Sequence, residues 1–318
     1  MSDATYLPGV YRKQGGNELV IGPTGLLSIE GPVTGLQAGS HFFVGSAVGS
    51  VTGSAAGSSS NDGLSYVKPK ATLIQGQTLA TASTGDIVHA MPGHVETISG
   101  AAGMTFSKAG VRYVGEGAGR NRPTITFDTA IGAQMIVSGA NVEFHNMVFN
   151  LAGFDAITAA ISVTGADVKF ENCEFITNTA TAGCVLGILT AATATRFTVR
   201  NCRFIGTFAN TGTTTTAQIK HEVGVDFCFE NNYHCGKMTQ AILNATTITN
   251  GLIRNNDFHI GTGTVAITME TSTAGLAAFN RACVASGTAP YAGAAFSWTQ
   301  NHYTTEANGP TAGTADAI

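Results

Sequence analysis

Two acidic side chains hold positions from which this chain could act on a glycosidic bond. Glu174 and Asp257 each stand two residues after the asparagine of a repeated phrase. Glycoside hydrolysis needs two carboxylates about 5–9.5 Å apart. Arg203 and Tyr233 hold the same position in the two intervening copies, so stacking at the strand spacing separates the acids by about 14 Å. The four residues predict a polar stripe that binds a sugar, with an ordinary solvated surface as the alternative.

A second candidate site combines Lys220, His221 and Glu222 with Asp226. These residues follow a threonine-rich segment at 211–216, and long excursions from regular structure often carry function. A histidine beside a lysine and a glutamate has the chemistry of a general base or of a lyase-type site. The alternative interpretation is a surface loop without a chemical role.

Metal and phosphate sites have weaker support from the spacing. His94 and Glu96 with His89 form an imperfect ligand set without a further clustered ligand, so we interpret them as part of a structural turn. The glycine-rich run at 115–119 resembles a phosphate loop, but a strand pattern follows where such a loop needs a helix. We therefore expect no metal and no cofactor.

The elements that position these residues follow from a six-residue phrase that returns seven times. It reads apolar, any, Asn, any, any, apolar; its copies stand 20 to 30 residues apart, and the last two are degenerate. Apolar and polar residues alternate before each copy, which places them on opposite faces of a strand. A strand-bearing unit that repeats every twenty to thirty residues is typical of a stacked solenoid. The sequence predicts an all-β, right-handed, single-stranded parallel β-helix.

The repeated asparagine stands where each strand must bend. Its short amide tolerates left-handed dihedrals and bonds to nearby backbone, so we expect a hydrogen-bonded amide ladder inside the wall. The residues just before it, Glu171, Arg200, Glu230 and Arg254, alternate in charge, which predicts opposite charges along the outer wall. The ladder would comprise Asn146, Asn172, Asn201, Asn231, Asn255 and Asn280.

Composition excludes several classes of protein. Only 11% of the 318 residues are charged, and 40 are glycine, which argues against a helical enzyme and against bulk disorder. The net charge of −4 gives no nucleic-acid footprint. No apolar run reaches the length of a membrane span, and no secretory signal is visible. The six cysteines form no CxxC pair; Cys173 and Cys202 share one position of the repeat, and we expect free, buried thiols.

The chain divides into four regions by composition. Residues 1–44 form an irregular arm with short predicted strands at 18–21 and 26–30, and residues 45–62 form a linker rich in Gly, Ser and Ala. Residues 63–303 carry the β-helix, with a capping helix near 69–82 whose Leu73, Ile74 and Leu79 lie near one stripe. Residues 304–318 form a polar tail or a second cap. An open solenoid end needs such caps because its apolar edge promotes aggregation.

Three segments resemble the opening of pectate-lyase-like right-handed β-helix proteins. They are NDGLS with KPKATL within 61–73, GDIVHAMPGHVETI at 85–98 and KAGVRYVGEGAGRNRPTI at 108–125. Their combination looks most like the β-helix proteins of tailed bacteriophages, and YLPGVYRKQGG at 6–16 resembles the start of small phage structural proteins. The resemblance implies a virion component, usually trimeric, that is assembled in the cytoplasm of the host bacterium.

Three functions therefore compete. We favour a structural virion protein, a capsid decoration or spike, because the chain is short and shows no paired acids in register. The alternatives are a tailspike-type depolymerase of host surface polysaccharide and a non-catalytic glycan-binding adhesin. Expected partners are other copies in a homotrimer, the major capsid protein or another virion protein, and possible host glycan, without nucleic acid or membrane. The arm would attach to the particle through aromatic and basic anchors, namely Tyr6, Tyr11, Arg12 and Lys13.

Overall fold

The computed structural model describes residues 10–12, 19–21, 39–46, 56–101, 103–222, 224–244, 246–261, 265–270, 274–284, 290–293 and 296–305. The chain falls into two compact units, Met1–Ala38 and Gly39–Ile318, which we describe separately. In the first unit, β1 (Val10–Arg12) pairs antiparallel with β2 (Leu19–Ile21). The predicted strand at 26–30 lies outside the described residues.

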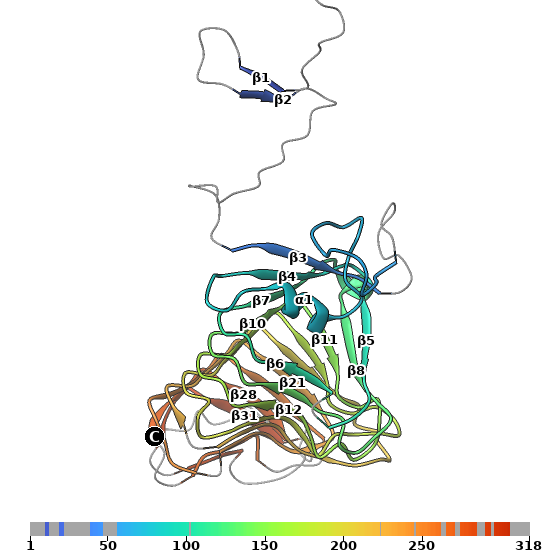
Figure 1. Cartoon of the computed structure of the whole chain (residues 1–318). Helices are drawn as coiled ribbons and strands as arrows, with labels where there is room; N and C mark the ends of the chain where they lie inside the picture. Colours follow the sequence, from blue (N-terminus) through green and yellow to red (C-terminus); the bar gives the residue numbers. More distant parts are fainter. Residues whose placement is uncertain are drawn as a thin grey trace, which may run out of the picture. The chain divides into compact units, whose positions relative to one another are not determined.

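The second unit is an all-β parallel β-helix, as the repeat predicts (Figure 1). Its coils contribute strands to three parallel sheets, here named B, C and D. Sheet B consists of β3 (His41–Val44), β4 (Ile87–Ala90), β7 (Arg112–Gly115), β10 (Glu143–His145), β13 (Lys169–Glu171), β16 (Thr198–Arg200), β20 (Cys228–Glu230), β24 (Gly251–Arg254), β27 (Gly275–Ala278) and β30 (Phe296–Thr299).

Sheets C and D complete each coil. Sheet C consists of β5 (Val95–Ile98), β8 (Thr124–Phe127), β11 (Val148–Asn150), β14 (Glu174–Ile176), β17 (Arg203–Ile205), β21 (Tyr233–Gly236), β25 (Asp257–Ile260), β28 (Arg281–Val284) and β31 (His302–Thr305). Sheet D consists of β6 (Met104–Phe106), β9 (Met135–Val137), β12 (Ala159–Val163), β15 (Leu186–Thr190), β18 (Thr215–His221), β22 (Met238–Asn244), β26 (Ile267–Thr268) and β29 (Tyr291–Ala292). A small extra pair joins β19 (Gly224–Val225) to β23 (Ile248–Thr249).

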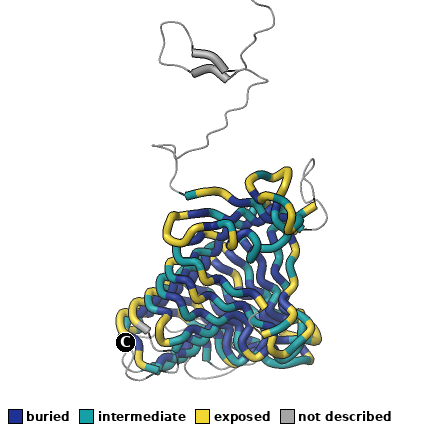
Figure 2. The backbone as a smooth tube through the Cα atoms, in the orientation of Figure 1, coloured by how far each residue is buried: buried dark blue, intermediate teal, exposed yellow. Residues whose placement is uncertain are grey.

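The core is a set of in-register stacks, because equivalent residues of successive coils lie one strand spacing apart. On sheet C, the rings of Phe149, Phe175, Phe204, His234 and Phe258 stack with centroids 4.6–5.2 Å apart. All five side chains are fully buried. Figure 2 shows buried segments that recur along the tube in coil after coil. Hydrophobic burial of this kind is the main stabilising contribution to the fold.

The capping helix is present as α1 (Leu73–Leu79). Thr72 caps it by accepting a hydrogen bond from the Gln75 amide at 3.2 Å, which satisfies one of the free N–H groups of the first turn. Leu73 is fully buried, and Ile74 and Leu79 pack against the core. The predicted stripe is therefore the face that covers the first coils.

The β-helix begins earlier than the predicted boundary at residue 63. Strand β3, assigned from sequence to the end of the arm, pairs in parallel with β4 through four residues. Phe42 and Val44 of β3 belong to the buried core. The glycine- and serine-rich segment at 45–62 is thus an excursion within the β-helix unit, and only part of it lies among the described residues.

The repeated asparagines occupy the corner between sheets B and C with left-handed backbones. Five of the six predicted residues, namely Asn146, Asn172, Asn201, Asn231 and Asn255, have φ of 54–56°. Their side chains are mostly exposed, and one pair, Asn172 to Asn146, comes within 3.4 Å. The expected amide ladder inside the wall is therefore not formed by these residues.

The buried amide ladder lies one position later in the repeat. Asn232, Asn256, Asn280 and Asn301 are at most 2% exposed. Asn256 donates to the Phe229 carbonyl, and its Oδ1 accepts from the Asn232 amide. Asn280 belongs to this ladder and not to the corner, because β27 pairs with β24 so that Phe279 follows Asn255 in the stack. The prediction matched Asn280 to Asn255 because both are asparagines, whereas Asn280 is equivalent to Asn256, one residue later in the repeat.

Candidate functional site

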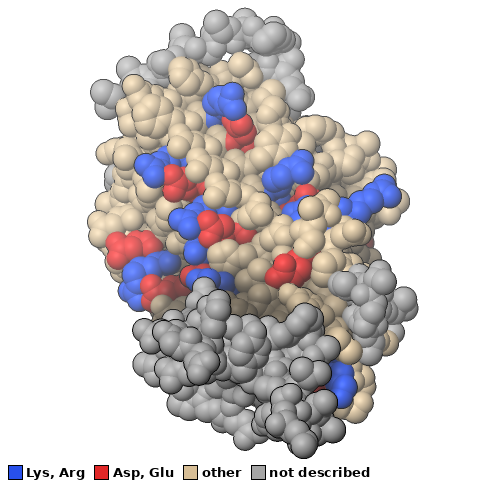
Figure 3. All heavy atoms as spheres, turned by 90° about the horizontal axis from the view of Figure 1, so that it is seen from above, with Lys and Arg blue, Asp and Glu red and all other residues tan. Residues whose placement is uncertain are grey.

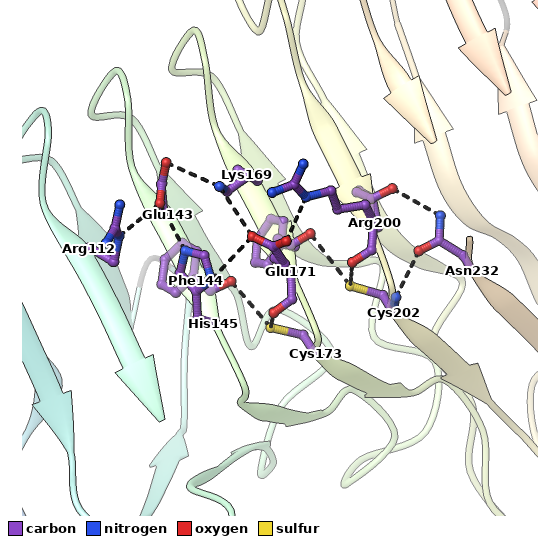
Figure 4. Close-up of polar contacts among 12 residues, drawn as sticks. Arg112, Glu143, Phe144, His145, Lys169, Glu171, Cys173, Arg200, Cys202 and Asn232 are labelled. Atoms are coloured by element: carbon purple, nitrogen blue, oxygen red, sulfur yellow. Dashed lines mark hydrogen bonds and ion pairs between the residues drawn. The ribbon is translucent and has the colours of Figure 1, made fainter. Parts of the chain in front are cut away.

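Among the residues that the structure describes, the largest group of charged side chains connected by ion pairs lies on the outer face of sheet B (Figure 4). Residues of alternating charge meet here because β7, β10, β13 and β16 pair in register. Glu143 bonds Arg112 at 2.9 Å and His145 at 2.9 Å. Lys169 reaches both Glu143, at 3.3 Å, and Glu171, at 3.2 Å. We call this group the sheet B cluster: Arg112, Glu143, His145, Lys169, Glu171 and Arg200.

Two carboxylates bridged by one ammonium group are close enough for acid–base chemistry, so their ionisation decides what they can do. The hydrogen bond from His145, with Lys169 and Arg112, outweighs burial and lowers the pKa of Glu143 to about 2. Burial opposes ionisation of Glu171, but Arg200 and Lys169 outweigh it and lower its pKa too. A glycosidase needs one carboxyl whose pKa is raised so that it can donate a proton. Neither glutamate meets this requirement.

The predicted charge alternation along the wall is confirmed by ion pairs. Arg200 pairs with Glu171, and Arg254 pairs with Glu230 in the coils that follow. In Figure 3, blue and red side chains lie against one another over much of the face in view. Exposed pairs of this kind contribute little individually, about 0–1 kcal/mol.

The outer face of sheet C carries the predicted polar stripe. Glu174, Arg203, Tyr233 and Asp257 occupy equivalent positions in four successive strands. Both acids are engaged: Glu174 lies 2.8 Å from Arg122 and 3.4 Å from Arg203, while both oxygens of Asp257 bond Arg281. The stripe therefore presents fixed ion pairs and a tyrosine, and the two acids do not act together.

Two hollows lie along this face. One, of about 350 Å³, is lined by Arg120, Arg122, Thr124, Val148 and Glu174 near the start of the β-helix. The other, of about 290 Å³, lies over the last strands of sheet C. It is lined by Asp257, His259, Arg281, Cys283, His302 and Tyr303 among others. Sequence reasoning missed both, because each depends on residues from three or more strands or turns.

The structure separates the predicted Lys220 site. Lys220 and Glu222 form an ion pair on the outside, whereas His221 is buried. Strand alternation in β18 turns His221 inward, where Nδ1 lies 2.7 Å from Thr190 Oγ1 and the ring stacks on Phe197. Burial lowers the pKa of His221 to about 4. The prediction that His221 acts as a base on the same surface as Lys220 and Glu222 is therefore wrong. Asp226 is an exposed corner residue with φ of 58°.

The three residues considered as metal ligands fall into two separate groups. His94 is buried and contacts Glu96 at 3.2 Å, whereas His89 contacts Glu116 at 2.7 Å and His41 at 2.8 Å. Within the described part of the chain, no group of three or more His, Cys, Asp or Glu side chains has a metal-binding arrangement.

The predicted attachment residues are only partly placed. Tyr11 and Arg12 lie in β1, and Tyr6 and Lys13 lie outside the described residues.

All six cysteines are free thiols, but only Cys173, Cys184 and Cys202 are buried, so the expectation of burial is wrong for the other three. Cys173 and Cys202 occupy one slot of the repeat, and each sulfur contacts a carbonyl of the preceding coil at 3.5 Å (Figure 4).

Comparison with known proteins identifies no family. No protein-family model matches the chain, and no curated protein matches its sequence. The structure is similar to a rhamnogalacturonan lyase, with a TM-score of 0.45 and 11% identity over 88% of this chain and 90% of that chain. It is also similar to the pectate lyase Pel9A, with a TM-score of 0.41 and 13% identity over 83% of this chain and 80% of that chain. Among the described residues, no helix is long and apolar enough to cross a membrane.

Proposed function

We propose that the protein is a structural component of a tailed-phage virion, a capsid decoration or spike protein. It is assembled in the host cytoplasm, attaches through its first unit and projects the β-helix from the particle. The observation that supports this best is the state of the outward acids. Every carboxylate of the sheet B cluster and of the sheet C stripe is held in an ion pair.

Such a wall suits a rigid scaffold better than an active site. A depolymerase that works by glycoside hydrolysis needs a carboxyl group that keeps its proton at neutral pH, and the two acids that lie close together, Glu143 and Glu171, both have lowered pKa values. The aromatic stacks and the buried asparagine ladder connect the coils over most of the β-helix. The proposed partners are two further copies in a homotrimer and the major capsid protein or another virion protein.

The attachment is tested with a truncated chain that begins at Gly39. It keeps β3 and the whole second unit, so it should fold and give the same β-rich circular dichroism as the full chain. Particles that lack the native protein should be decorated by the full chain and not by the truncated one, as seen by electron microscopy of labelled protein. Equal decoration by both would place the attachment on the β-helix wall and overturn this role of the first unit.

A second candidate function is saccharide binding without cleavage, which the hollow over the last strands of sheet C favours. Its lining offers a carboxylate and a guanidinium group from Asp257 and Arg281, two imidazoles from His259 and His302, and the ring of Tyr303. Such a mixture of donors, acceptors and an aromatic surface suits sugar hydroxyls. Incubation with host surface polysaccharide distinguishes the candidates: an adhesin binds it and leaves its length unchanged, a depolymerase shortens it, and a purely structural protein does neither.

A further inference from the structure

The hollow near the start of sheet C carries a surplus of positive charge. Arg120 and Arg122 line it together with Glu174, and Arg203 lies beside the same carboxylate. Two arginines thus line the hollow with one glutamate, and a third arginine contacts the same glutamate from outside the lining, whereas the whole chain has a net charge of −4. In the sheet B cluster each carboxylate is already shared among two or more cations, with Lys169 bridging Glu143 and Glu171. A local surplus of two positive charges over a concave surface attracts anions.

Arg122 and the backbone of the loop that carries Arg120 are held in place before any ligand arrives. Arg122 is 17% exposed and bonds Glu174 at 2.8 Å, which fixes its guanidinium group at the wall. The loop that carries Arg120 and Arg122 is anchored by the corner residue Asn146, whose amide donates to the Gly115 and Gly117 carbonyls at 2.7 and 2.9 Å. The Gly93 amide also donates to the Asn121 carbonyl at 2.7 Å. Preorganisation lowers the entropy that binding must offset.

Two of the arginines retain unused hydrogen-bonding capacity. Arg203 is 60% exposed and makes a single long contact with Glu174, at 3.4 Å. Within the described part of the chain, the Arg120 side chain has no ion pair or hydrogen bond. A guanidinium group offers five donors in a planar fork that matches oxyanions. Val148 contributes an apolar part of the lining, and the volume of about 350 Å³ lies within the range of small-ligand sites.

We propose that this hollow binds an oxyanion group, a phosphate, sulfate or carboxylate, with Arg120 and Arg203 as its direct ligands and Arg122 as a fixed positive wall. Glu174 acts as a positioning residue: it orients Arg122 and limits the affinity through its own charge. The site shares no residue with the proposed particle attachment or with the saccharide hollow, and it needs neither of them.

The test is an equilibrium titration of the full chain with inorganic phosphate, sulfate and glucuronate at constant ionic strength, with chloride as the balancing ion. Arg120→Gln and Arg203→Gln should each weaken binding about tenfold. Glu174→Gln should strengthen it about threefold, because a negative charge is removed. Arg196→Gln is the matched control, since Arg196 is also an exposed arginine in an ion pair, with Asp167 on another part of the surface, and it should leave binding unchanged.

The three ligands also separate the possible sources of the anion. Preference for phosphate or sulfate indicates a tetrahedral group, and preference for glucuronate indicates an acidic sugar; either agrees with the proposal. Absence of saturable binding for all three ligands overturns it. An equal loss in Arg196→Gln and Arg120→Gln overturns it as well, because the effect would then be one of overall charge.

Discussion

Replacing His234 by Phe should remove part of the sensitivity of this fold to acid. His234 is fully buried between Phe204 and Phe258, with ring centroids 4.7 and 4.8 Å away. Its Nδ1 lies 2.8 Å from Gln218 Oε1, and its Nε2 has no hydrogen-bond partner among the described residues. Burial lowers its pKa to about 3. In the folded protein the imidazole therefore stays neutral over the pH range in which the same histidine becomes protonated in the unfolded chain.

The size of the effect follows from the difference between the two states. An unfolded histidine has a pKa of about 6.5, so between pH 6.5 and 3 the unfolded state binds the extra proton and stability falls as pH falls. At pH 5 the loss is about 1.5 pH units multiplied by about 1.4 kcal/mol, or about 2 kcal/mol. This figure does not depend on the exact folded value, provided that it lies well below 5. His221, with a pKa of about 4, adds a loss of similar size.

The assay is urea denaturation of the wild type and His234→Phe at pH 7 and pH 5. The variant leaves Gln218 Oε1 without its contact to His234 Nδ1, which costs about 1–3 kcal/mol at both pH values, so the informative quantity is the change in the free energy of unfolding between them. That change should be about 2 kcal/mol smaller in the variant. His259→Gln is the control, because His259 is exposed and should leave the pH dependence as it is. Equal pH dependence in wild type and His234→Phe would refute the claim that this imidazole is buried and neutral.

Two further outcomes concern asparagines and thiols. Asn256→Leu should destabilise the fold by about 3 kcal/mol or more, because it removes the hydrogen-bond partners of the Phe229 carbonyl and of the Asn232 backbone amide. Asn201→Leu should cost only about 1–2 kcal/mol, from its left-handed backbone alone. Equal losses of stability in thermal denaturation would contradict this assignment. Burial raises the pKa of Cys184 to about 12, so Cys184 should react with a thiol reagent only after unfolding. The half-buried Cys228, Cys235 and Cys283 should react more readily in the folded chain. Mass spectrometry of partly labelled protein checks this order of reaction.

The sequence predicted the features that depend on one repeat unit. Alternation located the strands, and the conformational tolerance of asparagine located the corner, where Asn201 has φ of 55°. It also predicted the pairing of Glu171 with Arg200, because both residues immediately precede a corner. The alternation rule, applied one strand further, would have turned His221 inward, since Thr215, Ala217 and Ile219 alternate before it on the buried face.

Features that depend on the register between coils were not predictable in the same way. The phrase identifies a corner by residue type, and at Phe279 the corner residue is no longer an asparagine, so the alignment slipped by one at Asn280. The sheet B cluster and both hollows join side chains from several coils whose lengths differ through their corner excursions. His145 and Lys169 could have been found by listing the outward positions beside each corner, but their contact with Glu143 requires the actual pairing of β10 with β13.

The buried asparagines also bear on how long such a protein can be. From Asn232 onward, each amide accepts from the backbone N–H of the coil before it and donates to a carbonyl of that coil. In three earlier coils the equivalent position is occupied by Met147, Cys173 and Cys202, whose side chains do not offer both a strong hydrogen-bond donor and a strong acceptor. A whole coil inserted or deleted within the asparagine run leaves every remaining amide with an identical neighbour. We expect duplication or loss of coils to be tolerated between residues 232 and 301, so that relatives of this chain differ in length there by whole turns.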